Sequence, residues 1–245
     1  MTMVTLHEQL KEWAKEYNTP SFIENDPVQF PRKYKDSPVD AEISGLLTAL
    51  ISFGSRKQII KKAQELDDMF EGEPAKWIMQ NKFRRAFDMG NQSFYRTISH
   101  KTMYWHCYRI QSLLLAHGSL HKCLRYATDN VREFEGKSYF DVLKKAFGFV
   151  DESAAKRLAM FLRWMVRDDG IVDLGIWKGV DKKDLIIPLD AHVHRIALEL
   201  GITKRKTPDI KTAQEITNYF KTIWPEDPCL GDFALFGYGV NHKRP

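Results

Sequence analysis

Apolar residues recur along the chain at the spacing of an α-helix. In the segment that begins at Ser37-Pro38, the residues Val39, Ile43, Leu46 and Leu50 fall on one helical face. Alternating apolar and polar runs bounded by turn residues, the pattern of a β-strand, are nearly absent. The pattern therefore predicts an all-α protein, with further helices in seven stretches before residue 150: 6–17, 57–70, 75–79, 81–87, 103–116, 120–128 and 139–146.

Capping residues mark the helices of the C-terminal part. The cap region Asp151-Glu152-Ser153 precedes a helix with Leu158 and Phe161 on its buried face, which is expected to end near Arg167. The glycine-containing segment 171–188 is expected to be irregular. Three more helix starts are expected from a cap residue or a proline in the first turn: Asp190, Thr207-Pro208 and Asp227-Pro228.

Composition agrees with a folded domain and limits the compartment. The 245 residues are 43% hydrophobic and 28% charged, which is typical of globular proteins. The longest apolar run, residues 43–53, is shorter than the roughly 20 residues of a membrane-spanning helix, and the N-terminus lacks a signal-peptide pattern. We therefore expect a cytoplasmic protein without membrane association, nucleoid-associated if the source is bacterial.

Candidate metal and redox residues are sparse in the sequence. Cys107, Cys123 and Cys229 are widely spaced, which favours neither a disulfide framework nor a cysteine-ligated iron–sulfur cluster. His192 and His194, two residues apart at a helix start, point in different directions around the helix and make a poor metal pair. We expect neither a metal nor another cofactor.

Positive charge is concentrated in one part of the chain. Residues 56–125 contain thirteen Lys and Arg against six Asp and Glu, whereas the formal charge of the whole chain is +5. A polyanionic partner such as nucleic acid would explain this excess. Taken alone, the basic zone is more typical of a set of solvated helix faces, because Glu65, Asp67 and Asp68 interrupt it.

One motif is more specific. Residues 187–201 read Ile-Pro-Leu-Asp-Ala-His-Val-His-Arg-Ile-Ala-Leu-Glu-Leu-Gly. This order of an apolar residue, aspartate, histidine, arginine and a helix-ending glycine resembles the helix-hairpin-helix DNA glycosylase superfamily, which includes endonuclease III and 8-oxoguanine glycosylases. The resemblance implies that Asp190 lies at the mouth of a cleft and is essential for cleaving an N-glycosidic bond. Without the surrounding motif, the residue type alone would favour a plain helix N-cap for Asp190.

The same resemblance assigns a second catalytic residue. Superfamily members that also nick the sugar backbone carry a lysine early in the helix after the hairpin, and Lys156 is at that place. The separation of 34 residues between Lys156 and Asp190 is similar to that of the archaeal 8-oxoguanine branch and implies an oxidised purine as substrate. An exposed helical lysine without a catalytic role remains the alternative.

The two side chains have suitable chemistry for this reaction. A lysine amine that attacks the anomeric carbon forms a Schiff base, which permits strand cleavage. A neighbouring carboxylate stabilises the positive charge that develops on the sugar and assists proton transfer. Lys156 and Asp190 would together perform both tasks.

The resemblance also implies a set of DNA-binding and base-binding residues. The family hairpin usually contains Gly-x-Gly, whereas this chain has Gly148 alone, followed by two acids, so Ser153 and the first N–H groups of the next helix would have to bind the phosphate. For His192, a place near the phosphate or base pocket and a structural hydrogen bond are both open. Four further positions are assigned by resemblance, two to the opposed strand and two to the base pocket: Ser55, Arg56, Phe233 and Phe236.

The implied architecture has two helical subdomains with a cleft between them. Residues 39–179 would form a helical barrel with the hairpin and Lys156, and residues 1–38 together with 180–245 would form the second subdomain. The expected partner is duplex DNA with a damaged base or an abasic site, bound by a monomer. Two alternatives stay open: a nucleic-acid-binding module that keeps this fold without the chemistry, and a helical scaffold for protein interactions.

Overall fold

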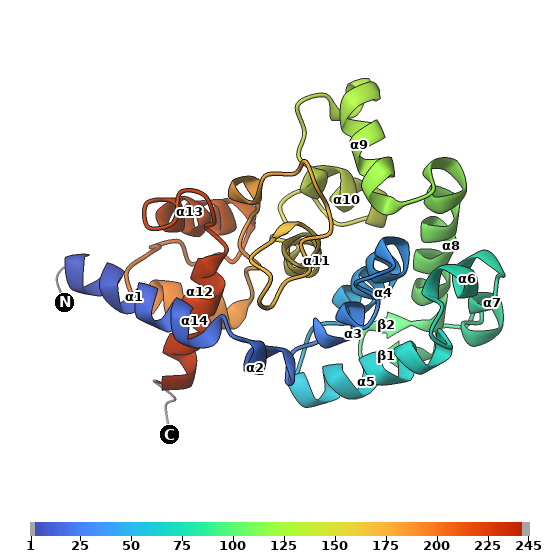
Figure 1. Ribbon diagram of the computed structural model, residues 1–245, viewed down its shortest axis with the longest axis horizontal. Helices are drawn as coiled ribbons and strands as arrows, with labels where there is room; N and C mark the ends of the chain where they lie inside the picture. The colour runs from blue at the N-terminus through green and yellow to red at the C-terminus, as the bar shows by residue number, and fades with distance from the viewer. Residues whose placement is uncertain (1–2, 242–245) are drawn as a thin grey trace. The chain divides into compact units, whose positions relative to one another are not determined.

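The computed structural model describes residues 3–241, and these residues are predominantly helical. They form fourteen α-helices, two short 3-10 turns and one antiparallel pair of short strands (Figure 1). The all-α prediction from the apolar periodicity is therefore confirmed. Within the described part of the chain, no helix is both long and apolar enough to cross a membrane.

The chain divides into two compact units. The terminal unit contains residues 1–24 and 148–245, and the central unit contains residues 25–147. The sequence-based division put the boundaries near residues 38 and 179 instead, because no linker composition marks the observed ones. In the observed division, the helix of Lys156 and the helix after Asp190 belong to the same unit.

The central unit is built around one helix with an apolar surface on nearly all sides. In α4 (Pro38–Leu50), every residue from Ala41 to Leu50 is buried. The buried carboxylate of Glu42 accepts hydrogen bonds from the backbone N–H groups of Leu120 (2.7 Å) and His121 (3.4 Å), at the start of α9. These bonds satisfy both the carboxylate and free donors of a helix N-terminus. The other elements of this unit are α3 (Gln29–Arg32), α5 (Arg56–Met69), α6 (Pro74–Met79), α7 (Phe83–Ala86), β1 (Ser93–Tyr95), β2 (Ile98–Ser99), α8 (His100–His117), α9 (Leu120–Asn130), a 3-10 turn (Arg132–Phe134) and α10 (Tyr139–Phe147).

The terminal unit brings the two ends of the chain together. Figure 1 shows α1 (Met3–Tyr17) beside α14 (Leu230–Asn241), and the two helices make extensive contacts. The close approach depends on Gly237, where an added Cβ would lie 2.5 Å from the Tyr17 ring. The other elements of this unit are α2 (Pro20–Ile23), α11 (Lys156–Val166), a 3-10 turn (Lys182–Asp184), α12 (Ala191–Glu199) and α13 (Ile210–Lys221).

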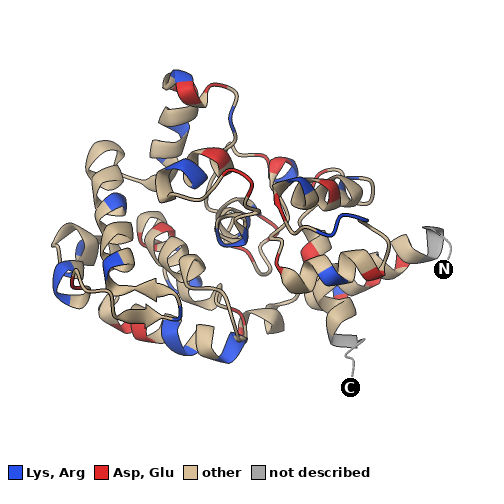
Figure 2. Ribbon diagram, turned by 180° about the vertical axis from the view of Figure 1, so that it is seen from behind, with Lys and Arg blue, Asp and Glu red and all other residues tan. Residues whose placement is uncertain are grey.

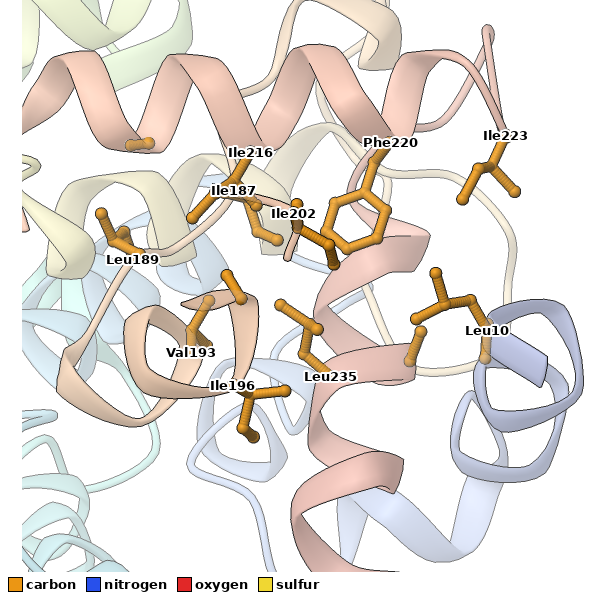
Figure 3. Close-up of a cluster of buried hydrophobic side chains, with 14 of the residues drawn as sticks. Leu10, Ile187, Leu189, Val193, Ile196, Ile202, Ile216, Phe220, Ile223 and Leu235 are labelled. Carbon is orange, nitrogen blue, oxygen red and sulfur yellow. The ribbon is translucent and has the colours of Figure 1, made fainter. Parts of the chain in front are cut away.

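One apolar cluster of the terminal unit combines side chains of α1, α12, α13 and α14. Leu10 of α1, Ile196 of α12, Phe220 of α13 and Leu235 of α14 are all completely buried in it (Figure 3). Ile187 and Leu189, which precede Asp190, lie in the same cluster. Burial of apolar side chains on both sides of Asp190 fixes the place of this residue at the start of α12.

Candidate functional site

Lys156 is the first residue of α11, and a special backbone conformation precedes it. Ala155, the N-cap residue, has a φ of +38°, in the left-handed region, and its side chain makes no capping hydrogen bond. The sequence-based expectation that residues 151–153 cap this helix is therefore wrong. The Ser153 hydroxyl instead accepts a hydrogen bond from the N–H of Ala155 (3.0 Å), outside the helix.

The segment before α11 is held by contacts to α13. The Ile210 N–H donates to the Glu152 carbonyl (2.9 Å), and Ser153 forms a β-bridge with Asp209. Gly148, at the start of this connection, has a φ of +71°, a conformation that favours glycine. Because these contacts fix the connection before the helix, Lys156 has a defined place at the start of α11.

Asp190 caps α12 with one carboxylate oxygen. Asp190 Oδ1 accepts hydrogen bonds from the N–H groups of His192 and Val193, both at 2.9 Å. A hydrogen bond from the Ile187 N–H to Thr217 Oγ1 (3.1 Å) holds the chain before the cap. The N-cap interpretation of Asp190 is therefore confirmed, and Oδ2 receives no hydrogen bond from this cap.

The two candidate catalytic side chains meet in the terminal unit. Lys156 Nζ lies 3.4 Å from Asp190 Oδ2, and the exposed fractions of the side chains are 27% and 37%. The pair therefore lies where the N-termini of α11 and α12 come together, and solvent reaches both groups. N–H groups without intrahelical partners, a cation and a carboxylate are thus present within one small region.

His192 lies next to this pair along the chain. It is exposed, and its Nδ1 lies 3.3 Å from the Arg195 guanidinium. A Cβ on Gly239 of α14 would come within 2.3 Å of His192 Nε2, so the glycine makes room for the imidazole. The imidazole is therefore held between α12 and α14.

The two predicted base-pocket phenylalanines have structural contacts. Phe233 is 1% exposed and lies 4.8 Å from the Arg163 guanidinium and 5.1 Å from that of Arg167. Phe236 packs edge-on against Phe22, with ring centroids 5.0 Å apart. The ring of Phe233 is enclosed by protein in this conformation and offers no open face for a base.

Ser55 and Arg56 lie in the central unit. Ser55 is the N-cap of α5 and accepts a hydrogen bond from the Gln58 N–H at 3.4 Å. Arg56 lies 3.8 Å from the Asp26 carboxylate. Both residues therefore have local structural roles in their own unit.

A buried charge network on α11 was not predicted from the sequence. Arg167, with a fully buried side chain, contacts Asp173 (2.8 Å), Asp227 (2.9 Å) and Asp169 (2.7 Å). Arg163 contacts Asp173 (3.2 Å) and Asp232. Arg163 inside the otherwise apolar stretch 158–166 and Arg167 directly after it were a signal in the sequence, because buried cations require anionic partners. Their partners are distant in the sequence and could not be assigned from it.

Burial and ion pairing act in opposite directions on Asp227 and Arg167 of this network. Burial raises the pKa of the Asp227 carboxyl from its ordinary value, against the lowering effect of Arg167. The ion pairs with Asp173, Asp227 and Asp169 outweigh burial at Arg167 and raise the pKa of its guanidinium further. Arg167 is therefore permanently charged.

Comparisons with known proteins place the chain in a family. Searches for similar curated proteins and for similar solved structures gave no significant match. Residues 26–241, most of the chain, match the family described as "Protein of unknown function (DUF2400)". The match includes Lys156, Asp190 and both arginines of the buried network. The chain therefore belongs to the DUF2400 family.

Proposed function

We propose that the chain is a DNA glycosylase with AP-lyase activity, which removes a damaged base, such as an oxidised purine, from duplex DNA. The observation that carries the proposal is the 3.4 Å approach of Lys156 Nζ to Asp190 Oδ2. The chemistry that the sequence motif implies requires such an approach of a nucleophile and a carboxylate. Flipping the damaged nucleotide out of the duplex would give these groups access to its sugar.

The proposed steps use the two side chains in different roles. The Lys156 amine, after giving up a proton, attacks C1′ of the sugar, and the bond from C1′ to the base breaks. Asp190 Oδ2 lies within reach to accept the amine proton and to stabilise positive charge on the sugar. The C1′–O4′ bond then breaks, the ring oxygen takes up a proton, and a Schiff base joins Lys156 to the opened deoxyribose. Loss of a C2′ proton to a base breaks the C3′–O bond and releases the 3′ phosphate.

The surroundings of the pair are suited to an anionic substrate. The first N–H groups of α11 favour negative charge, whereas the His192 and Val193 N–H groups of α12 already donate to Asp190 Oδ1. Asp190 Oδ1 is already used as the cap, so a substrate would meet Oδ2 and the lysine. The cap bonds fix the orientation of the carboxylate before any substrate arrives, which is an advantage for catalysis.

A second candidate function is a nucleic-acid-binding module without chemistry. The connection 148–155 favours it, because it lacks the Gly-x-Gly turn and carries two exposed acids, Asp151 and Glu152, beside the start of α11. In that case the ion pair of Lys156 and Asp190 would serve only to hold α11 against α12. Binding to DNA without excision of any lesion, unaffected by Asp190→Asn, would select this alternative.

The test is excision by the full chain and its variants. Duplexes that carry 8-oxoguanine, uracil, an alkylated base or an abasic site are incubated with the wild-type protein, Lys156→Gln and Asp190→Asn. We expect release of one of these bases by the wild type and strong loss in both variants. A folded wild-type protein without activity on any duplex would contradict the proposal.

The chain offers a matched control for this test. Lys182 and Asp168 form another ion pair of the terminal unit (2.8 Å), with a side-chain exposure of 32% for the lysine, similar to that of Lys156. The variants Lys182→Gln and Asp168→Asn change the same residue types at a site that the proposal does not use. They should keep wild-type excision.

A further inference from the structure

Helix α8 of the central unit presents aromatic rings to solvent. Trp105 is 42% exposed and Tyr108 is 40% exposed, whereas Met103, Cys107 and Ile110 on the opposite side of the helix are buried. The ring centroids of Trp105 and Tyr108 are 5.5 Å apart, and those of Tyr104 and Trp105 are 5.7 Å apart. We call the three neighbouring side chains Tyr104, Trp105 and Tyr108 the α8 aromatic face.

Packing of the unit does not account for this face. The buried stripe of α8 already attaches the helix to its neighbours, and Tyr104 alone contacts the core side, through the Phe83 ring at 5.4 Å. Large aromatic side chains are usually more buried than this, and groups of exposed ones mark binding surfaces. The exposed rings are therefore available to a partner.

The charged residues of α8 itself are all basic. Helix α8 contains no aspartate or glutamate, and none occurs in residues 89–128 of the sequence. Figure 2 shows the ribbon of α8 with basic segments and no acidic one. Lys101 and Arg109 lie on the exposed side, and neither has an ion-pair partner in the part of the chain that the structure describes. Asp88, which is outside α8, lies 3.8 Å from His100 at the start of the helix.

The order of these residues along α8 is regular. Lys101, Trp105 and Arg109 are four residues apart, so they lie on neighbouring turns of one side of the helix. At 1.5 Å per residue, the two cations are about 12 Å apart along the axis. A stacked strand with roughly 3.4 Å per nucleotide would place about three nucleotides over this distance.

We propose that the α8 aromatic face, with Lys101 and Arg109, binds unpaired nucleic acid. Bases stack on aromatic rings irrespective of sequence, and cations on either side contact the phosphates. A duplex would not fit this chemistry, because its bases are stacked on each other and hide their flat faces. The surface lies in the central unit and is separate in sequence from the pair of Lys156 and Asp190, so it does not rest on the proposed glycosylase function.

Binding of the full chain to a labelled dT oligomer of a dozen nucleotides, measured by fluorescence anisotropy, tests the proposal. Trp105→Ala combined with Tyr108→Ala should weaken binding about tenfold or more, because stacking is lost. Trp105→Phe should keep most of the affinity. The control Leu115→Ala removes a 69% exposed apolar side chain of the same helix without an aromatic ring and should bind like the wild type.

The salt dependence of the affinity distinguishes the contribution of the two cations from that of the aromatic rings. For single strands, each phosphate contact contributes about 0.7 to the slope of log affinity against log salt. Lys101→Ala combined with Arg109→Ala should therefore lower this slope by about 1.4, while the aromatic variant keeps the wild-type slope. Inorganic polyphosphate, which has no bases, should bind the aromatic variant and the wild type equally.

The outcomes are distinct from those of the excision test. Asp190→Asn should bind the dT oligomer like the wild type, and the aromatic variant should keep the activity of Lys156 on an abasic duplex at low salt. Equal affinity of wild type and aromatic variant for the oligomer, with unchanged melting temperature, would overturn the proposal. Binding of polyglutamate that depends on Trp105, without oligomer binding, would also overturn it and assign the face to an acidic protein.

Discussion

The two ends of helix α11 use ion pairs in opposite ways. At the first residue, Lys156 meets Asp190 at 3.4 Å with both groups partly open to solvent. Near the other end, Arg167 is completely buried and contacts three aspartates at 2.7 to 2.9 Å. Lys156, Arg163 and Arg167 lie on one side of the helix, because they are separated by seven and four positions.

The difference in burial between these ion pairs shows which of them is available for chemistry. Breaking a buried pair leaves a charge without water or a partner, so Arg167 is committed to the fold. A partly exposed pair contributes little to stability, because water replaces the lost partner at small cost. Contacts with a substrate can therefore replace the ion pair between Lys156 and Asp190 without unfolding the unit.

The largest effect is expected from breaking the buried end. Arg167→Met leaves Asp173 and Asp227 buried without their shared cation and should lower the free energy of unfolding by about 3–5 kcal/mol. Urea denaturation measures this change. Lys156→Met, on the same helix, is the control and should change stability by about 1 kcal/mol or less. Equal effects of the two variants would refute the contrast between the ends of α11.

The next largest effect is expected on the excision rate of Asp190→Asn, a variant that removes the charge of Asp190 but keeps its helix cap. Asparagine caps helices about as well as aspartate does, so Asp190→Asn should keep the fold. It removes the negative charge that faces Lys156 and should reduce excision by about a hundredfold or more. Single-turnover rates on the preferred duplex measure this. A rate within a factor of two of the wild type would exclude a role of the charge.

A smaller effect is expected for stability when the cap itself is removed. Asp190→Ala loses both hydrogen bonds to the N–H groups of α12 and should lower the free energy of unfolding by about 1 kcal/mol. Thermal unfolding of the alanine and asparagine variants side by side measures the cap contribution. The cap account fails if both variants melt at the same temperature.

The smallest effect is a pH dependence from the buried end. Burial raises the pKa of Asp227 above its ordinary value of 3.8, so the folded protein binds this proton more tightly than the unfolded chain does. The contribution of Asp227 to stability is therefore greatest at low pH and declines as pH rises from 3.8 to the raised pKa. The difference in unfolding free energy between the wild type and Asp227→Asn, followed upward from pH 3.5, should show this decline. A rise over the same range would contradict the assigned direction.

Local signals in the sequence predicted much of the fold. Pro38 and Asp190 mark helix starts because the fixed backbone of a proline in the first turn and the capping bonds of an aspartate depend only on neighbouring residues. The start of α11 could not be predicted in this way. It depends on the left-handed conformation of Ala155 and on contacts of residues 152 and 153 with the start of α13, more than fifty residues away.

The candidate site was predictable only in its two central residues. The motif around Asp190 and the place of Lys156 identified a pair that the fold brings to 3.4 Å across 34 residues. The role of Phe233 was not predictable, because its burial against arginines follows from tertiary structure. The cap that Ser55 forms with the Gln58 N–H is a local contact, but the resemblance assigned Ser55 to the opposed strand instead. The exposure of the α8 aromatic face was not predictable either, because the sequence gives its residue types but not which of them the fold leaves exposed.

Reductive trapping on an abasic duplex tests the central claim most directly. The full chain is incubated with the duplex and borohydride, and the cross-linked peptide is located by mass spectrometry. The account predicts a covalent adduct on Lys156 that disappears in Lys156→Gln and persists in the control Lys182→Gln. No adduct, or an adduct on another lysine that persists in Lys156→Gln, would contradict the assignment of Lys156 as the nucleophile.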